Sequence, residues 1–183
     1  MIQEKEGYYM EKNQKNNWKK YIFAVLWFLV LVVIDQVTKW MAVVHLKNND
    51  AFVLIPGVFE LQYLENRGAA FGIFQGKQFL FLIGGAIVCA GVIFLYGKIP
   101  STKRFFALRF CSVLICAGAI GNMIDRIRLD YVVDFLYFSL IDFPIFNVAD
   151  CYVVASCFLF AFLILFVYKE KELSCFSIRK KKN

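Results

Sequence analysis

YIFAVLWFLVLVVI, residues 21–34, is an unbroken run of fourteen apolar residues. A helix on the surface of a soluble protein carries polar residues on one face, and this run has none, so it is suited to lipid. Two lysines precede it, as in a cleaved signal peptide, but no small-residue cleavage site follows and Asp35 and Lys39 continue the helix. We therefore expect a transmembrane helix over Tyr21–His45.

Three further segments have the length and apolar character of membrane spans, each close to the roughly 20 residues that a helix needs to cross a bilayer. They are Phe79–Tyr96, about Phe105–Ile124, and Cys151–Tyr168. The chain is 60% hydrophobic, whereas soluble domains are about 45–50% apolar. The sequence predicts an integral membrane protein, mainly α, in which residues 1–183 form one domain built on a four-helix bundle.

Basic residues predict the orientation of this bundle. They concentrate before the first helix, between the second and third, and after the fourth, which together hold 14 of the 21 lysines and arginines. The positive-inside rule then places the basic tails, 1–20 and 169–183, and the 97–104 loop in the cytoplasm. Membrane topology thus explains the net charge of +7, and we expect contact with anionic lipid headgroups and no nucleic-acid partner.

The first of the two outer connections has strand character. In Val58–Glu65, apolar and polar residues alternate, which is typical of a half-buried strand. Pro56-Gly57 is a turn signal before it, so Phe52–Ile55 and Val58–Glu65 are predicted to form a hairpin, closed by Asn66–Gly72. Tyr131–Phe135, in the second outer connection, is a further short extended run. We expect a small extracytoplasmic sheet.

This topology brings the unusual polar residues to one side of the membrane. A charged side chain costs about 2.5–3.5 kcal/mol or more at the bilayer centre, so each needs a partner or a function. The residues concerned are Asp35, Lys39, Asn122, Asp125, Asp134 and Asp150. Their convergence predicts a polar site near the outer face.

A pair of carboxylates is the chemistry that this set offers most directly. Two aspartates that share one proton can hydrolyse a peptide bond, because one activates water while the other polarises the carbonyl. Any two of Asp125, Asp134 and Asp150 could serve on chemical grounds, and we favour Asp134 with Asp150. Asn147 is a predicted N-cap of the fourth helix, so Asp150 is alternatively a first-turn residue favoured by the helix dipole. In a catalytic pair, the same position favours an ionised Asp150 and a protonated Asp134.

The other polar residues are predicted to support the pair. Asn122 and Asp125 share a helix face, and Asp125 with the adjacent Arg126 is alternatively a structural ion pair. Asp35 and Lys39, four residues apart, are expected to pair with each other.

Other protease chemistries lack their parts. The chain has a single histidine, His45, and no His-Glu-x-x-His motif, which excludes an intramembrane zinc protease of that type. A serine–lysine pair using Lys39 stays open, although no serine is evident beside it. The six cysteines form no Cys-x-x-Cys motif and are interpreted as small packing residues, without a disulfide or a metal.

Two readings from other functional classes also stay open. Intramembrane carboxylates can mark a proton-coupled transporter, although the acids gather at one face and do not form a path across. Polar groups can also join the helices of a non-catalytic scaffold, which leaves three acids at one end unexplained.

The ordered motifs resemble those of bacterial lipoprotein signal peptidase, the signal peptidase II family, over about residues 21–168. The matching stretches are Asp35-Gln36-x-Thr38-Lys39, Asn66-Arg67-Gly68-Ala69-Ala70-Phe71-Gly72, Gly121-Asn122-x-x-Asp125-Arg126, Val132-Val133-Asp134-Phe135 and Phe146-Asn147-x-Ala149-Asp150. One departure is Asp130, where a glycine is expected in many relatives. If the backbone there needs a positive φ, aspartate is a tolerable replacement, and it adds a negative charge near the site.

The resemblance implies an aspartyl endopeptidase of the bacterial cytoplasmic membrane, with Asp134 and Asp150 as its catalytic pair. The family removes the signal peptide of prolipoproteins, cutting just before a cysteine that carries diacylglycerol. The residues that would shape or support the site are Asn66, Gly68, Asn122, Asp125, Arg126, Asn147 and Ala149, with Asp35 and Lys39 as a further pair. The implied fold is four transmembrane helices, a small outer β-cradle and an outer helix. We expect a monomer that needs no metal or organic cofactor.

Overall fold

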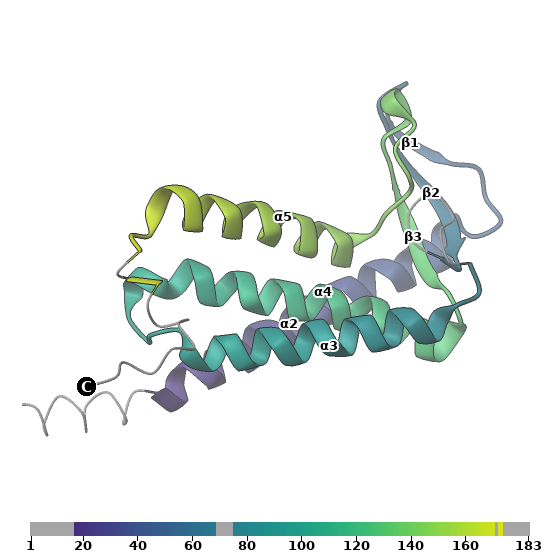
Figure 1. The fold of residues 1–183 in the computed structure, drawn as a ribbon. Helices are drawn as coiled ribbons and strands as arrows, with labels where there is room; N and C mark the ends of the chain where they lie inside the picture. The colour runs from purple at the N-terminus through teal and green to yellow at the C-terminus, as the bar shows by residue number, and fades with distance from the viewer. Residues whose placement is uncertain (1–16, 69–74, 171, 174–183) are drawn as a thin grey trace, which may run out of the picture.

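The computed structural model describes residues 17–68, 75–170 and 172–173. Four long helices lie side by side, and a small sheet stands across one end of them (Figure 1). The helices are α2 (Asn17–Leu46), α3 (Gln78–Lys98), α4 (Phe106–Leu129) and α5 (Val148–Phe162). The 3-10 turn η2 (Lys103–Phe105) leads into α4, and the π-helical turn η4 (Leu163–Val167) extends α5. All four segments are long and apolar enough to cross a membrane, which confirms the predicted fold class.

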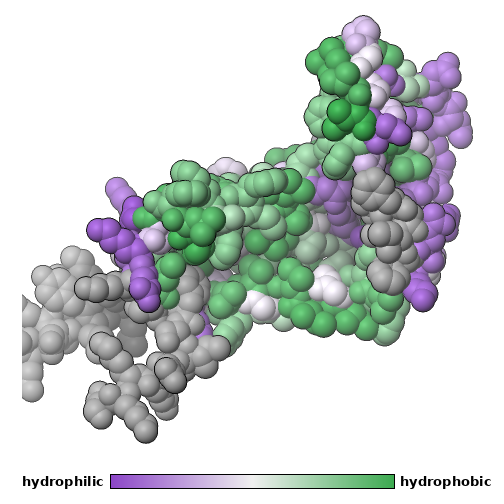
Figure 2. All heavy atoms as spheres, turned by 45° about the horizontal axis from the view of Figure 1, so that its top comes forward, coloured by the Kyte–Doolittle hydropathy of each residue, from purple (hydrophilic) through white to green (hydrophobic). Residues whose placement is uncertain are grey.

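Helix α4 is the centre of the bundle. It contacts each of the other three helices and buries the side chains of Leu108, Cys111 and Val113. The outer helices instead expose large apolar side chains, such as Ile87 on α3 and Phe158 on α5. Figure 2 shows the resulting apolar surface along the helices. Such a surface is suited to lipid, since a helix satisfies its own backbone hydrogen bonds there.

Two glycines let α4 approach its neighbours closely. A Cβ atom added at Gly118 would lie 2.5 Å from the carbonyl oxygen of Ala149 on α5. A Cβ atom added at Gly121 would lie 2.5 Å from Oδ2 of Asp35 on α2. Small residues at helix crossings allow backbones to pack together in membranes. This packing brings the polar residues of three helices within reach of one another.

The sheet has three antiparallel strands in the order β1 (Phe52–Ile55), β2 (Phe59–Asn66), β3 (Val132–Tyr137). The predicted hairpin of β1 and β2 is confirmed, and its turn holds Gly57 at φ 69°. β2 pairs with β3 so that Leu64 faces Asp134 and Asn66 faces Val132. This pairing was not predicted, since the register depends on a contact between distant segments. It places Asn66 beside the strand that carries Asp134.

The sheet is fixed to the bundle through a small apolar cluster. Val133 and Phe135 of β3 pack with Ala42 and Leu46, near the end of α2. Leu61 and Tyr63 of β2 pack against the same cluster, in agreement with the half-buried strand predicted from their alternation. The strand that carries Asp134 is therefore held by packing against α2 and by its pairing with β2.

Most predicted element boundaries lie within a few residues of the observed ones. The main difference is in α4, which continues to Leu129, past the predicted end at Ile124, so Asp125 lies inside the helix. Between β3 and α5 the described chain contains one helical turn, η3 (Ser139–Ile141). The outer helix implied by the family resemblance is absent from the described part of the 47–77 connection, and residues 69–74 of that connection lie outside the described residues.

Candidate active site

Asp134 and Asp150 line one cleft of about 680 Å³ at the sheet end of the bundle. Asp134 comes from β3 and Asp150 from the first turn of α5, so the two side chains reach the cleft from different elements. Asn66, Asn122 and Arg126 line the same cleft. The structure therefore brings together the residue types that the sequence predicted to converge.

The start of α5 fixes the position of Asp150. Asn147 and Asp150 form a capping box: the Asn147 side chain accepts a hydrogen bond from the backbone N–H of Asp150 (3.0 Å), and the Asp150 side chain accepts one from that of Asn147 (3.1 Å). Asn122 Nδ2 donates a further hydrogen bond to Asp150 Oδ1 at 2.8 Å. The N-cap predicted from the sequence is thus present, and it holds the carboxylate at the positive end of the helix dipole.

Asp134 is held by two asparagine amides. Asn66 Nδ2 donates to one carboxylate oxygen at 2.8 Å, and Asn147 Nδ2 donates to the other at 2.6 Å. The side chain is almost fully buried, with 1% of its surface exposed. Burial, and secondarily the charge of Asp150, raises the pKa of Asp134 to about 7, although both amide hydrogen bonds oppose the shift. A carboxyl group of this kind can carry a proton at neutral pH.

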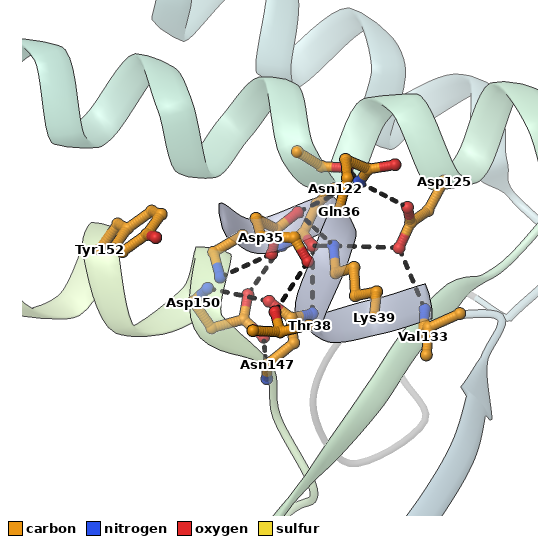
Figure 3. Close-up of polar contacts among 12 residues, drawn as sticks. Asp35, Gln36, Thr38, Lys39, Asn122, Asp125, Val133, Asn147, Asp150 and Tyr152 are labelled. Atoms are coloured by element: carbon orange, nitrogen blue, oxygen red, sulfur yellow. Dashed lines mark hydrogen bonds and ion pairs between the residues drawn. The ribbon is translucent and has the colours of Figure 1, made fainter. Parts of the chain in front are cut away.

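Lys39, which does not line the cleft, connects three polar side chains (Figure 3). Its ammonium group lies 3.0 Å from Asp35 and 2.9 Å from Asp125, and it donates a hydrogen bond of 2.8 Å to Asn122 Oδ1. The predicted pairing of Asp35 with Lys39 is therefore observed. The carboxylate of Asp125 pairs with Lys39, and the alternative ion pair with Arg126 is not found among the described contacts.

Both carboxylates of this cluster also hold a backbone N–H next to an aspartate of the cleft. Asp125 Oδ2 accepts from the N–H of Val133 at 3.2 Å, one residue before Asp134. Asp35 Oδ1 accepts from the N–H of Ala149 at 3.0 Å, one residue before Asp150. The cluster thus ties α4 to β3 and α2 to α5 beside the two cleft aspartates.

Gln36, for which the sequence predicted no role, also belongs to this cluster. Its side-chain amide donates to Asp125 (2.9 Å), to Asp35 (3.1 Å) and to the carbonyl of Gly121 (3.2 Å). Its role could have been predicted from its position: Gln36 directly follows Asp35 after the apolar run, and a polar side chain there needs a hydrogen-bond partner.

Arg126 and Gly68 form another wall of the cleft. Arg126 Nη2 donates to the carbonyl of Gly68 at 3.3 Å, and the guanidinium lies 4.5 Å from the ring centroid of Phe81. The Asn66 side chain accepts from the N–H of Gly68 at 3.0 Å, which fixes the orientation of its amide toward Asp134. Of the Asn66–Gly72 segment, residues 69–72 lie outside the described residues.

Within the described residues, no group of three or more histidine, cysteine, aspartate or glutamate side chains is arranged to hold a metal ion. The cleft itself presents two carboxyl groups held by amides, beside an arginine. Such a pair can share a proton and act as acid and base.

A sequence profile described as "Signal peptidase (SPase) II" matches residues 27–166 of this chain. The chain belongs to the signal peptidase II family. It is therefore a peptidase, as predicted, and family membership argues against the transporter and scaffold readings. The matched region begins within α2 and contains the other three helices, the sheet and every residue of the cleft described above.

Similar proteins agree with this assignment to the signal peptidase II family. The lipoprotein signal peptidase of Streptococcus thermophilus (strain CNRZ 1066) is 41% identical over 144 residues, which cover 79% of this chain and 91% of the relative. That of Streptococcus pyogenes serotype M5 (strain Manfredo) is 38% identical over 154 residues, 84% of this chain and 97% of the relative.

Solved structures also match the fold of this signal peptidase II family chain. One, described as a bacterial membrane enzyme determined by the in meso method at 2.3 Å, has a TM-score of 0.70 and 30% identity, covering 87% of this chain and 94% of the other. A second of the same description, at 1.9 Å, has a TM-score of 0.68 and 31% identity, covering 80% and 94%. Together with the four spans, these matches identify a multi-pass bacterial membrane protein.

Asp130 occupies the position where the resemblance leads us to expect glycine. It ends α4 in the left-handed conformation, with φ 63°, and its N–H donates to the carbonyl of Arg126 at 3.2 Å. The condition stated from the sequence, a backbone that needs a positive φ, is therefore met. Aspartate is among the few residues that adopt this conformation at modest cost.

Proposed function

We propose that this protein removes the signal peptides of diacylglyceryl-modified prolipoproteins, cleaving just before the lipidated cysteine, with Asp134 and Asp150 as the catalytic residues. The observation that carries the proposal is the placement of two carboxyl groups in one cleft, of which Asp134 has a pKa of about 7. Relatives named lipoprotein signal peptidase support the substrate class.

In the proposed mechanism, Asp150 is ionised and Asp134 is protonated. Asp150 accepts a proton from a water molecule as that water attacks the scissile carbonyl carbon, and Asp134 donates a hydrogen bond and then its proton to the carbonyl oxygen. When the tetrahedral intermediate collapses, the C–N bond breaks, Asp150 returns its proton to the leaving nitrogen, and Asp134 regains the proton of the oxygen. The helix N-terminus and two donors beside Asp150 support its role as the base.

The remaining polar residues act as support in this mechanism. Asn66, Asn122 and Asn147 orient the two carboxyl groups. The Lys39 cluster fixes Asn122 and the backbone N–H groups that precede the two aspartates. The proton transfers run between the two aspartates, the attacking water and the peptide, so we propose a mechanism without a metal or organic cofactor.

The composition of the cleft supports a lipid-linked substrate. Beside its polar groups, the cleft is lined by apolar side chains of the β3–α5 connection and of α5, including Phe143, Ile145 and Val154. Phe143 and Val154 are also exposed at the molecular surface, where an apolar modification could approach from the bilayer. We propose that the diacylglyceryl group and the apolar signal helix enter laterally on this side.

The orientation follows from the distribution of charge. With the basic ends of the helices in the cytoplasm, the cleft lies near the outer face of the cytoplasmic membrane. We propose that both termini are cytoplasmic and that the protein acts as a monomer, since every group in the mechanism comes from one chain.

The experiment that tests this function is cleavage of a diacylglyceryl-modified prolipoprotein by purified protein. We expect the Asp134→Asn and Asp150→Asn variants to lose at least about 10²–10⁴-fold in rate, the usual contribution of a general acid or base. The Asp125→Asn variant should keep measurable activity, because that residue acts through its neighbours. Full activity of either cleft variant would overturn the assignment. Inactive wild-type protein, folded and supplied with the lipidated substrate, would overturn the proposed substrate class.

A further inference from the structure

Side chains of α2, α3 and α4 line a second cavity. The start of α2 and the end of α3, which contribute to it, lie at the end of the bundle opposite the sheet (Figure 1). The volume of the cavity is about 370 Å³, and its lining is almost entirely apolar. Val25 and Phe28 of α2, Ile93 of α3 and Val113 of α4 contribute to it. None of its lining residues lines the cleft of Asp134 and Asp150, so the mechanism does not use it. We call it the inner groove.

A buried ammonium group lies at one end of the inner groove. Lys20 Nζ lies 5.1 Å from the ring centroid of Tyr21 and 5.8 Å from that of Tyr96, and both tyrosines line the groove. The Lys20 side chain is only 9% exposed, and it donates to the carbonyls of Gly97 (3.3 Å) and Ile99 (3.1 Å) at the end of α3. The cation is thus held in place by backbone oxygens.

A second buried cation, Arg109, lies beside the connection between α3 and α4. Arg109, 7% exposed, donates to the carbonyls of Pro100 and Thr102, directly after the segment that binds Lys20. No carboxylate of the described residues forms an ion pair with either cation. Buried charges are normally paired, and carbonyl dipoles alone supply no full countercharge. Two such cations in one region therefore make this end of the bundle suited to bind an anion.

Other charges at this end of the bundle also favour the binding of an anion. Lys19 and Lys98 flank Lys20 and the end of α3. The described acidic residues that follow α5 are Glu170 and Glu172, and Glu172 pairs with Arg104 at 3.1 Å. Among the described residues, the charges around the groove end are therefore mainly positive.

We propose that the inner groove holds one acyl chain of an anionic phospholipid whose phosphate lies at the Lys20 end. The apolar lining fits a hydrocarbon chain, and the buried ammonium of Lys20 with the guanidinium of Arg109 fits a phosphate at membrane-surface depth. Tyr21, half exposed at the groove end, has the amphipathic character of residues that occupy the membrane interface. This site is distinct from the one that receives the substrate, and it does not depend on the proposed peptidase mechanism.

The test is lipid binding by the full-length protein in detergent, measured by native mass spectrometry. The probes are phosphatidylglycerol and phosphatidylcholine with identical acyl chains. We expect one molecule of phosphatidylglycerol to bind at least ten times more tightly than phosphatidylcholine. Val25→Trp should fill the groove and weaken phosphatidylglycerol binding at least tenfold. Leu26→Trp is the matched control, because Leu26 is exposed on the same helix but does not line the groove.

The headgroup is tested by charge removal. Lys20→Gln should abolish the preference for phosphatidylglycerol, whereas Lys103→Gln, at the same end of the bundle, should keep it. Lys98→Gln keeps the buried ammonium of Lys20 and should lower the preference for phosphatidylglycerol. This variant provides the test if Lys20→Gln fails to fold. Equal binding of both lipids by the wild type, or unchanged binding in a folded Val25→Trp variant, would overturn the proposal.

Discussion

The ammonium group of Lys39 donates a hydrogen bond to the side-chain oxygen of Asn122, and so determines that the amide nitrogen of Asn122 faces Asp150. An asparagine amide can be placed in two ways, with oxygen and nitrogen exchanged. With a cation on one side and a carboxylate on the other, only one placement satisfies both neighbours. Lys39 is therefore a positioning residue for Asp150, although it lies outside the cleft lining.

The first prediction concerns Lys39→Met. This change removes the donor that orients Asn122 and leaves Asp35 and Asp125 as two buried carboxylates without a cation. We expect a loss of about 3–5 kcal/mol in the free energy of unfolding, as for other broken buried ion pairs. In the fraction that folds, kcat should fall more than KM rises, because the defect lies in the orientation of Asp150. Denaturation and cleavage assays measure the two effects.

The matched control for this change is Lys47→Met. Lys47 pairs with Glu65 at 3.0 Å, but both side chains are partly exposed, so the expected loss is about 1 kcal/mol or less. Equal losses in the two variants would contradict the role assigned to the buried cluster. Addition of Asp35→Asn to Lys39→Met should recover part of the stability, because one uncompensated charge is removed.

The second prediction concerns pH and cleavage. In the proposed mechanism Asp134 must be protonated, and its pKa is raised to about 7. The rate of a single turnover should therefore fall as the pH rises through about 7. This fall in rate is tested by measuring cleavage of the lipidated substrate by the purified enzyme at closely spaced pH values. A rate that stays level to pH 9, with the protein still folded, would contradict protonated Asp134 as the acid.

The raised pKa of Asp134 also makes the stability of the folded protein depend on pH. Asp134 has a pKa of about 7 when folded and an ordinary value of 3.8. Between these values the folded state holds a proton that the unfolded state has lost, so stability falls as the pH rises across this window. Asp134→Asn does not titrate and should show a smaller decline from pH 4 to pH 7. Thermal unfolding midpoints in the same buffers measure the difference.

Much of the fold was predictable because the apolar runs and the basic residues carry strong and independent signals. The capping box at Asn147 was predictable as well, since it depends on residues three apart in one helix. Helix spacing also predicted that Asn122 and Asp125 lie on one face, and both contact Lys39. In each of these cases the information is local in the chain.

The unpredicted features depend on contacts between distant segments. The pairing of β2 with β3 sets Asn66 beside Asp134, and no local pattern fixes that register. The choice of Lys39 over Arg126 as the partner of Asp125 depends on how closely α2 approaches α4. Sequence spacing offered the adjacent arginine only as an alternative partner, and helix packing brought the lysine to the carboxylate instead.

The third prediction concerns Asp130. Its φ of 63° suits glycine better than any residue with a side chain, and a carboxylate at a helix C-terminus opposes the helix dipole. We expect Asp130→Gly to raise the free energy of unfolding by about 0.5–1 kcal/mol. Asp130→Val should lower it, because a β-branched residue is strained at positive φ. Asp130→Asn keeps the tolerance for this conformation and removes the charge, so any change that it makes in the pH profile reports the charge alone.

The last prediction concerns the two glycines of α4 that lie against other helices. A methyl group at Gly118 would meet the carbonyl oxygen of Ala149, and one at Gly121 would meet the Asp35 carboxylate. Neither neighbour is the flexible end of a side chain that can turn away, since Ala149 contributes backbone and Asp35 is held by Lys39. We expect Gly118→Ala and Gly121→Ala each to cost about 1–3 kcal/mol of stability, as for other overpacked sites.

Gly84→Ala on α3 separates this clash from the general effect of replacing a glycine. A methyl group at Gly84 would have no neighbour within 4 Å, so this variant should be as stable as the wild type or slightly more stable. Gly121→Ala should in addition reduce cleavage beyond its effect on folding, because Asp35 holds the backbone N–H that precedes Asp150. If Gly121→Ala folds and cleaves at the wild-type rate, the position of Asp35 does not matter for Asp150, and the link from α2 to the catalytic pair would have to be abandoned.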